Sequence, residues 1–439
     1  MGTNSTDDRG LDLVVIGSGM AGMTAAAAVA ERGGRVAVVE KAPEIGGSSA
    51  MSGGWVWTAP EPAVLIEESP HADPGLIRSL CDEYPRLMAW IMASGAPVGD
   101  EAVVLDYGRG RPVGMSEYLD WCRSAVERAG GTVRTRAQMY SLVVERSRVA
   151  GAAVYHGGEE VEIRAPWTLL ASGGFQADAQ LLAAHVHPNA PSMLLRSNRA
   201  SEGDGLRAAL AAGAATSPAM DGFYGHLISW PTDVWVPGVY TLLSQYHSHR
   251  AALVNIDGEV FEPPFPSDHY NAQWTVRQPS GRAVMVFDQL LYDDQASPIA
   301  GGERPNSFEV AASHGAHAAR ADSLAELGRA VSEWGFATED LPATLASFNA
   351  RATPPKQSVA VAPFYALEVR AAITFTHGGV RIDDAARALD AAGRALPGLL
   401  AAGADAGGVH AGGYGGGLAT AGVFGLRAAD TVLASLDRA

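Results

Sequence analysis

A glycine-rich turn between an apolar run and a helix constrains this chain more than any other feature. Residues 13–16 are all apolar and run directly into Gly17, Gly19 and Gly22, which are spaced as Gly-x-Gly-x-x-Gly. The first glycine allows a tight turn, the second lets the backbone approach a pyrophosphate, and the third lets the helix pack closely on the strand. The helix N-terminus offers N–H groups and a positive dipole to phosphates. Glu40 ends a second apolar run, where a carboxylate can bind a ribose diol. This order predicts a dinucleotide site, and the alternative is a glycine turn with only a structural role.

Length, charge and cysteine content exclude several classes of protein. A chain of 439 residues is expected to form two or three domains. Its net charge of −16 argues against a nucleic-acid partner, because such binding depends on Lys and Arg at phosphates. No apolar run is long enough for a membrane span, and residues 1–10 lack the hydrophobic segment of a signal peptide. Cys81 and Cys122 lack metal-ligand spacing, so we expect structural thiols in a reducing cytoplasm.

Glycine and hydroxyl residues recur where strands are expected to end. The loop at 46–54 contains four glycines and three serines, whose N–H groups and hydroxyls suit a bound polar ligand. A strand is expected at 131–137, and alternating apolar residues from 141 to 164 then predict an antiparallel meander. A buried strand from Trp167 breaks on Gly173 and Gly174. We therefore expect the chain to return to the ligand at this second break.

The middle of the chain changes in composition. Helical spacing is expected at 74–94, at 116–129 and in an alanine-rich segment that follows Gly205. Residues 220–292 are rich in Trp, Tyr, His and Pro and show few regular patterns, which indicates an inserted segment that could wall a substrate pocket. Helical periodicity resumes at 322–349, and Pro354-Pro355 suggests a hinge.

The C-terminal part carries a second glycine-rich loop that feeds a helix. Residues 412–417 contain five glycines around Tyr414, and an apolar segment at 418–436 follows. Such a loop at a helix N-terminus stabilises partial negative charge on a ligand. Simple loop flexibility is the alternative.

These motifs together resemble the flavoprotein-subunit family of fumarate reductase and succinate dehydrogenase, which also contains 3-ketosteroid dehydrogenases and tricarballylate dehydrogenase. The similarity extends from Leu13 to about Ala429. Its carriers are the residues 17–22, 40–41, 46–54, 171–175, 203–205, 376–379 and 397–403.

The resemblance implies an α/β fold that binds FAD. It implies a Rossmann-like FAD-binding domain, with a parallel sheet plus an antiparallel meander, and an inserted α+β capping domain. We expect the FAD-binding domain at 10–218 and 356–439 and the substrate-binding cap at 219–355. Covalently flavinylated members have a histidine around 48–51, and this chain has none there, so noncovalent FAD is expected.

The resemblance also assigns residues to the cofactor. In the family a Glu often follows Ala-Ala-Gly, whereas this chain has Ala404 there and Asp405 one position later. The residues expected to bind FAD are Gly17, Gly19, Met20, Ala21, Gly22, Glu40, Lys41, Gly47, Ser48, Ser49, Gly53, Gly54, Ala137, Ala171, Ser172, Gly173, Asp204, Gly403, Asp405, Gly417 and Leu418.

Departures from the family pattern predict the substrate class. Fumarate-handling members have a general-acid arginine where this chain has Ser267, a substrate-binding histidine where it has Phe375, and a carboxylate-binding arginine where it has Tyr414. Only His226 matches the remaining position. An unpaired buried carboxylate is costly, so these losses disfavour a dicarboxylate. A tyrosine after the glycine-rich loop is similar to the ketosteroid dehydrogenases.

We therefore expect an FAD-dependent dehydrogenase or reductase that acts on a C–C bond next to a carbonyl in a neutral, cyclic or hydrophobic substrate. Hydride transfer at flavin N5 would be accompanied by proton transfer at Tyr414, His226 or His377. Each of these side chains could instead have a packing role. The sequence has no Cys-x-x-Cys-His haem motif, so the expected partners are a small-molecule substrate and a separate electron acceptor or donor, such as a quinone, oxygen or a redox protein.

Two alternatives stay open at this point. One is an organic-acid reductase in which Arg199, Arg250 or Arg277 replaces the missing arginines, and the other is a flavin-binding module without catalysis. His247 and His249 alone make a poor metal site, so no metal is expected.

Overall fold

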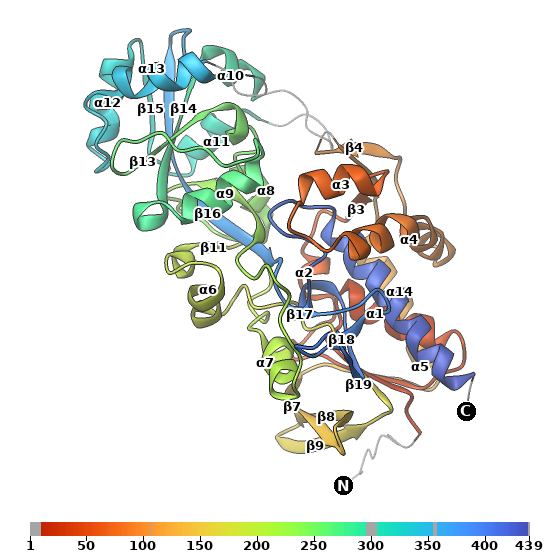
Figure 1. Ribbon diagram of the computed structural model, residues 1–439. Helices are drawn as coiled ribbons and strands as arrows, with labels where there is room; N and C mark the ends of the chain where they lie inside the picture. The colour runs from red at the N-terminus through yellow and green to blue at the C-terminus, as the bar shows by residue number, and fades with distance from the viewer. Residues whose placement is uncertain (1–9, 106, 296–304, 354–357, 438–439) are drawn as a thin grey trace. The chain divides into compact units, whose positions relative to one another are not determined.

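The computed structural model describes residues 10–105, 107–295, 305–353 and 358–437 (Figure 1). The chain divides into two compact units. The first unit comprises Met1–Leu181, Asn198–Gly222 and Phe375–Ala439, and the second unit comprises Leu182–Ser197 and Phe223–Thr374. Each unit contains its own main sheet.

A six-stranded sheet forms the centre of the first unit. Its order is β18-β19-β10-β1-β2-β6, and all neighbours pair in parallel except the edge pair of β18 and β19. Strands β1 and β2 are buried on both faces, which explains their uninterrupted apolar sequences. The strands are β1 (Leu13–Ile16), β2 (Val36–Val39), β6 (Thr132–Arg134), β10 (Trp167–Leu170), β18 (Arg387–Leu389) and β19 (Ala395–Ala401).

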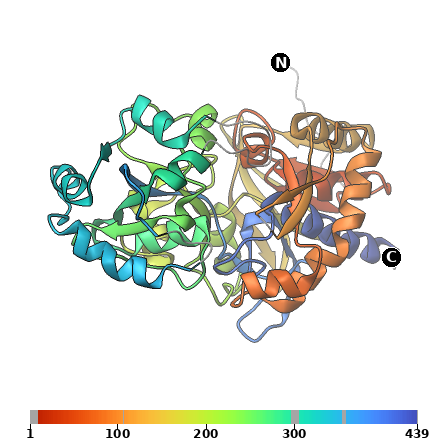
Figure 2. The same ribbon diagram turned by 90° about the horizontal axis from the view of Figure 1, so that it is seen from above.

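Helices from both ends of the chain cover this sheet. Figure 2 shows the C-terminal helix α14 (Gly417–Leu436), in dark blue, among N-terminal elements in red and orange. It packs against α1 (Met20–Ala30), which also contacts α5 (Met115–Arg128). A Cβ at Gly425 would lie 2.6 Å from the carbonyl oxygen of Ala21, so the close approach of α14 to α1 requires glycine there.

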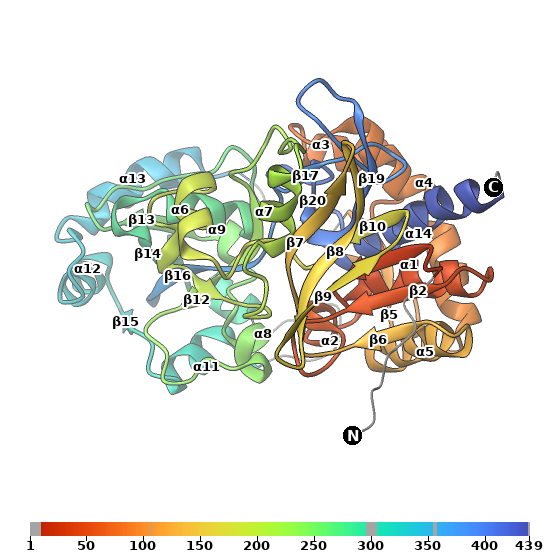
Figure 3. The same ribbon diagram turned by 90° about the horizontal axis from the view of Figure 1, so that it is seen from below.

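Smaller sheets and helices complete the first unit. Figure 3 shows the antiparallel meander of β7 (Ala137–Glu145), β8 (Arg148–His156) and β9 (Glu159–Arg164). The other elements are α2 (Gly47–Ala50), β3 (Trp55–Thr58), α3 (Pro62–Glu68), α4 (Pro74–Ala93), β4 (Ala102–Val104), β5 (Gly108–Pro112), α7 (Asp204–Ala211), β17 (Val380–Arg381), η5 (Gly403–Asp405) and β20 (Ala406–Gly407). Helix α6 (Ala179–His185) begins in the first unit and ends in the second.

The second unit is built around a long strand. Strand β16 (Phe364–Thr376) pairs with β14 (Arg282–Asp288) and β15 (Ala318–Ala321) in antiparallel fashion and with β11 (Leu194–Leu195) in parallel, and it also pairs with β12 (Phe223–Ser229). Helices α12 and α13 pack their apolar faces on this sheet. The remaining elements are η1 (Ala190–Ser192), η2 (Pro237–Val239), α8 (Tyr240–Leu243), η3 (Ser248–Arg250), β13 (Ala252–Asn255), α9 (Asp268–Val276), η4 (Pro279–Gly281), α10 (Gln289–Asp294), α11 (Ser307–Ser313), α12 (Leu324–Ser332) and α13 (Leu341–Arg351).

Several sequence predictions are confirmed in the first unit. The parallel sheet and the antiparallel meander are both present. The helices expected at 74–94, 116–129 and 418–436 correspond to α4, α5 and α14 within one residue at each end. Strong hydrophobic periodicity and glycine punctuation made these elements predictable.

The second unit differs more from the sequence predictions. The segment 220–292 contains regular strands and helices, although its sequence shows few regular patterns. Its strands are buried on both faces, so their sequences lack the alternating pattern by which a strand is recognised. The stretch 322–349, where helical periodicity was expected, forms the two helices α12 and α13.

The boundaries of the units also differ from the expected ones. The second unit includes 182–197 and continues to Thr374, past the expected boundary at 355, because most of β16 pairs with strands of this unit. Pro354-Pro355 and most of the expected leader at 1–10 lie outside the described residues. In the described ranges, no helix is long and apolar enough to cross a membrane.

Candidate active site

The turn between β1 and α1 contains two glycines that the protein requires and one that it does not. Gly17 has φ +103°, and a Cβ there would lie 2.2 Å from the carbonyl oxygen of Ala171. A Cβ at Gly22 would lie 2.0 Å from the carbonyl oxygen of Gly17. At Gly19 the nearest described atom would be Ser49 Oγ, 3.5 Å away. The protein itself therefore leaves space at Gly19, at the N-terminus of α1, where a phosphate can bind.

The buried carboxylate of Glu40 stabilises this turn. Its Oε2 accepts hydrogen bonds from the Ser18 backbone N (3.0 Å) and hydroxyl (2.7 Å), and its Oε1 accepts one from the Ala42 N (2.8 Å). A carboxylate has about four acceptor positions, so one remains for a ribose hydroxyl. The carbonyl of Glu40 accepts from the backbone N of Ala137, which places that expected cofactor residue beside the turn.

The glycine–serine loop packs against the same turn. Ser49 Oγ accepts a hydrogen bond from the first amide of α1, at Met20 (3.0 Å), and Ser48 Oγ accepts from the backbone N of Asn198 (3.3 Å). Gly54 has φ +72°, and a Cβ there would lie 2.4 Å from the carbonyl oxygen of Val113. The loop thus joins the N-terminus of α1 to the segment that begins at Asn198.

A second buried carboxylate stabilises the second glycine turn. Asp405 accepts hydrogen bonds from the Ser172 backbone N, from the Ser172 hydroxyl (2.8 Å) and from the Gly174 N (3.2 Å). Burial raises the pKa of Asp405, and these hydrogen bonds oppose the rise. Ser172 Oγ also accepts from the backbone N of Gly205 in the first turn of α7 (3.2 Å). Asp405 therefore ties together β10, α7 and the segment after β19.

Lys41 links the first turn to α7. Its Nζ lies 2.8 Å from Asp204 Oδ2 and 2.8 Å from Glu202 Oε2. Burial alone would lower the pKa of Lys41, but the two carboxylates outweigh burial and raise it. Lys41 and Asp204, both expected at the cofactor, are thus brought into direct contact.

All the residues that the sequence assigned to FAD lie in the first unit. Gly403 lies against α1, because a Cβ there would be 3.1 Å from the Cβ of Ala21. Gly417 and Leu418 begin α14, and both are partly exposed. Three features fit a bound dinucleotide. They are the open space at Gly19, the N-termini of α1 and α14, and the two glycine turns that Glu40 and Asp405 stabilise through hydrogen bonds.

Tyr414 and His377 belong to one aromatic cluster in the first unit. Tyr414 is 8% exposed, and its ring contacts Trp57, Phe375 and His410. Its hydroxyl accepts a hydrogen bond from the backbone N of Gly417 (2.9 Å), the first residue of α14. His377 contacts Phe375 and His410 in the same cluster. This hydrogen bond fixes the Tyr414 hydroxyl at the first turn of α14.

His226 lies in the second unit, in a network that the sequence did not predict. Its Nδ1 lies 2.5 Å from Asp268 Oδ2, and its Nε2 lies 2.9 Å from the hydroxyl of Tyr224. His269 Nδ1 lies 2.9 Å from the other oxygen of Asp268. Burial lowers the pKa of His226 to about 4. Burial alone would raise the pKa of Asp268, but the two histidines hold it well below its usual range.

Two of the three arginines proposed as replacements have other partners and the third is exposed, whereas Arg196 lies near His226. Arg250 pairs with Asp294 (2.5 Å), and Arg277 stacks on Trp274. Arg199 is exposed. Arg196 donates to the Tyr246 hydroxyl (3.3 Å) and to Thr374 Oγ1 (3.1 Å), and its charge contributes to the low pKa of His226. Ser267, at the family's arginine position, is the N-cap of α9.

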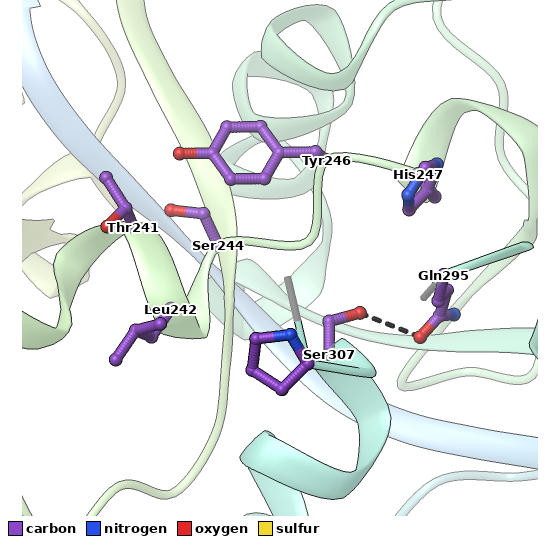
Figure 4. A pocket seen from close by; sticks show the side chains of 8 residues that line it. Thr241, Leu242, Ser244, Tyr246, His247, Gln295 and Ser307 are labelled. Atoms are coloured by element: carbon purple, nitrogen blue, oxygen red, sulfur yellow. Dashed lines mark hydrogen bonds between the residues drawn. The ribbon is translucent and has the colours of Figure 1, made fainter. Parts of the chain in front are cut away.

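A small depression, open to solvent and lined by both polar and apolar side chains, lies beside this network in the second unit. Figure 4 shows its labelled side chains, with Ser307 donating to Gln295 (2.7 Å). Tyr246 lines the depression and packs its ring against His226 (4.8 Å between centroids). His247 Nε2 and Gln295 Nε2 have no hydrogen-bond partner among the described residues. Burial lowers the pKa of His247 to about 4.

The thiols lie apart from these features. Cys81 and Cys122 are free and buried, and burial raises their pKa values to about 11 and about 12. Such thiols are poor nucleophiles. Within the described part of the chain, no group of three or more His, Cys, Asp and Glu residues is placed to hold a metal ion.

Asp268, Arg196, His269 and His410 are the site residues that sequence reasoning missed. Asp268 lies 42 residues from His226, and no short motif connects them. The only local signal was Ser267 before the helix at 268–276, because serine is a preferred N-cap residue.

Comparison with known proteins agrees with the geometry of the first unit. A family model described as FAD binding domain matches residues 12–99 and 101–419. A probable fumarate reductase, Ifc3, from Shewanella frigidimarina is 27% identical over 457 residues, which cover 95% of this chain and 74% of the relative. The 3-oxosteroid 1-dehydrogenase of Mycobacterium tuberculosis is 26% identical over 531 residues, which cover 89% and 92%.

A solved structure shares the fold. The 3-ketosteroid-delta4-(5alpha)-dehydrogenase of Rhodococcus jostii RHA1, solved with 4-androstene-3,17-dione, superposes with a TM-score of 0.74 at 21% identity and covers 96% of each chain. Because the family model spans nearly the whole chain, this protein belongs to the FAD binding domain family and is an FAD-dependent oxidoreductase of the dehydrogenase and reductase type.

Proposed function

We propose that this enzyme introduces or removes a C=C bond next to a carbonyl in a neutral, cyclic or hydrophobic substrate, with noncovalently bound FAD. The observation that carries this proposal is the aromatic environment of Tyr414. Its ring lies among Trp57, Phe375 and His410, and its hydroxyl is oriented by the amide of Gly417. Such a site suits a carbonyl oxygen better than a carboxylate, which would need a cationic partner.

The first unit would hold the cofactor through the residues already named. Bound FAD supplies hydride transfer at its N5. Tyr414 would donate a hydrogen bond to the substrate carbonyl, and the positive end of α14 would stabilise negative charge that develops on that oxygen. His377 would orient the same region. The second unit would act as the substrate-binding cap.

Electrons would be exchanged with a separate partner. The sequence has no haem motif, so we propose a quinone, oxygen or a redox protein as the second reactant. The relatives include cytochrome-linked fumarate reductases, and that linkage is a property of those proteins.

Anaerobic mixing of the FAD-loaded enzyme with a substrate panel tests the proposal. Saturated cyclic ketones and lactones should bleach the oxidised flavin, or cyclic enones should reoxidise the photoreduced flavin, whereas dicarboxylates should do neither. Tyr414→Phe should lower the rate about 10²- to 10⁴-fold, the usual contribution of a positioned proton donor. Tyr84→Phe is the matched control, because it also removes one partly buried tyrosine hydrogen bond of the first unit, that to the Val56 carbonyl.

One observation favours a second candidate, an organic-acid reductase. Arg196 places a guanidinium beside the Tyr246 hydroxyl and near His226, where it could bind a carboxylate. Reoxidation of reduced flavin by fumarate, abolished in Arg196→Gln, would support this candidate and refute the neutral substrate. If no member of either panel changes the flavin spectrum, a non-catalytic flavin-binding module becomes the better description.

A further inference from the structure

We propose that Tyr224 is the side chain that exchanges a proton with the substrate carbon, and that His226 and Asp268 act behind it as positioning residues that hold the transferred proton. This inference rests on the proposed function. It assigns to His226 a different role from direct contact with substrate.

The three side chains form one continuous chain of hydrogen bonds. The Tyr224 hydroxyl lies 2.9 Å from His226 Nε2, and His226 Nδ1 lies 2.5 Å from Asp268 Oδ2. Both ring nitrogens of His226 are therefore engaged within the protein. A substrate could contact either nitrogen only by displacing Tyr224 or Asp268.

The two ends of this hydrogen-bonded series differ in how deeply they are buried. His226 is 1% exposed and Asp268 is 4% exposed. Tyr224 is only partly buried. The phenol is thus the member of the chain that a substrate can contact, and the imidazole lies behind it.

The position of the protons follows from the partners of Asp268. Hydrogen bonds from His226 and His269 hold the pKa of Asp268 well below its usual range, although burial alone would raise it. An ionised carboxylate only accepts hydrogen bonds, so Nδ1 of both histidines carries a proton. Asp268 is also the first residue of α9, where the helix dipole favours negative charge.

The lone pair of His226 consequently points at Tyr224. Burial lowers the pKa of His226 to about 4, with Arg196 and His269 adding to the effect and Asp268 opposing it, so the ring is neutral at pH 7. In this tautomer Nε2 is an acceptor, and the Tyr224 hydroxyl donates to it. The arrangement is that of a nucleophile–histidine–carboxylate triad with a phenol in the first position.

Protons and electrons balance in both desaturation and reduction. In desaturation the C–H bond next to the carbonyl breaks, its proton passes to the Tyr224 oxygen, and the Tyr224 proton passes to His226 Nε2. The electron pair of that bond becomes the new π bond as a hydride leaves the neighbouring carbon, and the flavin of the proposed function is its acceptor. Asp268 stabilises the imidazolium formed. In reduction the same protons move in reverse.

The experiment compares Tyr224→Phe, His226→Gln and Asp268→Asn with a matched control, in FAD-loaded full-length enzyme. Tyr292→Phe is the control, because Tyr292 lies in the same unit, stacks on Tyr365 and donates its hydroxyl to Glu309 (2.6 Å). Flavin spectral titration gives the substrate Kd, and stopped-flow bleaching gives the rate of the chemical step. The chosen substrate is a ketone or enone that the wild-type enzyme turns over.

Tyr224→Phe should lower the bleaching rate about 10²- to 10⁴-fold while the substrate Kd and the FAD content stay unchanged. Asp268→Asn should lower the rate about 10⁴-fold, because the asparagine leaves the imidazole in the wrong tautomer. Tyr292→Phe should match the wild type. Wild-type bleaching should show a solvent deuterium isotope effect that Tyr224→Phe changes, which a purely structural role would not produce.

Nitrogen NMR of ¹⁵N-histidine-labelled wild type provides a second measurement if Asp268→Asn fails to fold. A proton on Nδ1 of His226, with an Nε2 resonance that shifts in Tyr224→Phe, is the expected result. A proton on Nε2 would overturn the relay. If the wild type bleaches normally and Tyr224→Phe bleaches equally fast, the relay is wrong and the proposed function stands. If the wild type reacts with no member of the panel, the proposed function fails and the relay fails with it.

Discussion

Two alanine substitutions in the β1–α1 turn should separate cofactor binding from folding. Gly17→Ala and Gly19→Ala change glycines two positions apart in the same motif. The structure gives them different constraints, because the protein itself excludes a Cβ at Gly17 and leaves room for one at Gly19.

At Gly17 an alanine should mainly reduce the stability of the folded apoprotein. The residue has φ +103°, a conformation that costs an L-residue about 1–3 kcal/mol. A Cβ would also lie 2.2 Å from the carbonyl oxygen of Ala171, far inside van der Waals contact. Gly17→Ala should therefore destabilise the apoprotein by more than the strain alone, and it should lower FAD affinity as a consequence.

At Gly19 the cost should fall on FAD. The backbone is extended, with φ −72°, and alanine adopts this conformation freely. As an N-cap, alanine is less favourable than glycine by about 0.5–1 kcal/mol. If a phosphate binds here, the methyl group should cost at least one charged hydrogen bond, about 1.5–3 kcal/mol, or about a 10- to 100-fold rise in the FAD Kd.

Apoprotein stability by urea unfolding and FAD affinity by quenching of flavin fluorescence measure the two effects separately. The expected pattern is a near-normal stability with weakened FAD for Gly19→Ala, and a large loss of stability for Gly17→Ala. Gly33→Ala is a control for the general effect of replacing a glycine at positive φ, because a Cβ there would contact nothing within 4 Å. A Gly19→Ala variant that binds FAD as tightly as the wild type would refute the assignment of this space to the cofactor.

Three further predictions concern charged groups. Asp405→Ala should destabilise the apoprotein by about 3 kcal/mol or more, because it leaves three hydrogen-bond donors of the 172–174 turn without a partner, at about 1–3 kcal/mol each. Thermal and urea unfolding measure this loss of stability. Asp390→Ala is the control, because Asp390 lies in a more exposed hairpin turn. Burial lowers the pKa of His226 and His247 from 6.5 to about 4, so the unfolded chain binds more protons between these values and stability should fall as the pH drops through that window. The fall should be about 1.4 kcal/mol per pH unit for each histidine, and His226→Gln should remove one of the two contributions in unfolding measured at about pH 7 and about pH 4.5. Lys41→Met should cost only about 0–1 kcal/mol of apoprotein stability, because the ion pairs of Lys41 are partly exposed. This loss of stability should become smaller in about 1 M salt, which screens exposed charges. A larger loss that does not depend on salt would show that the ion pairs behave as buried.

The strand, glycine turn and helix on which the cofactor assignment depends could be predicted from the sequence because local rules determine them. A glycine-rich turn between a buried strand and a helix has few conformational alternatives, and the N-terminus of that helix offers N–H groups and a positive dipole end to a phosphate. The same reasoning placed Gly17, Gly22 and the start of α14 correctly. The sequence did not show that Glu40 and Asp405 each hold a glycine turn through backbone N–H groups.

The second unit could not be predicted in the same way. Its strands are buried on both faces and show no alternation, so the segment 220–292 lacked a readable period. The side chains of Tyr224, His226 and Asp268 meet only because β12 and α9 pack together.

The sequence by itself therefore determined the dinucleotide turn, the parallel sheet around it and the family, because those features depend on backbone geometry within a few residues. Only the tertiary structure decided which polar groups share hydrogen bonds, because contacts between residues distant in sequence carry no spacing signal. It placed Tyr414 at the first amide of α14, and it replaced an isolated His226 by a tyrosine–histidine–aspartate chain.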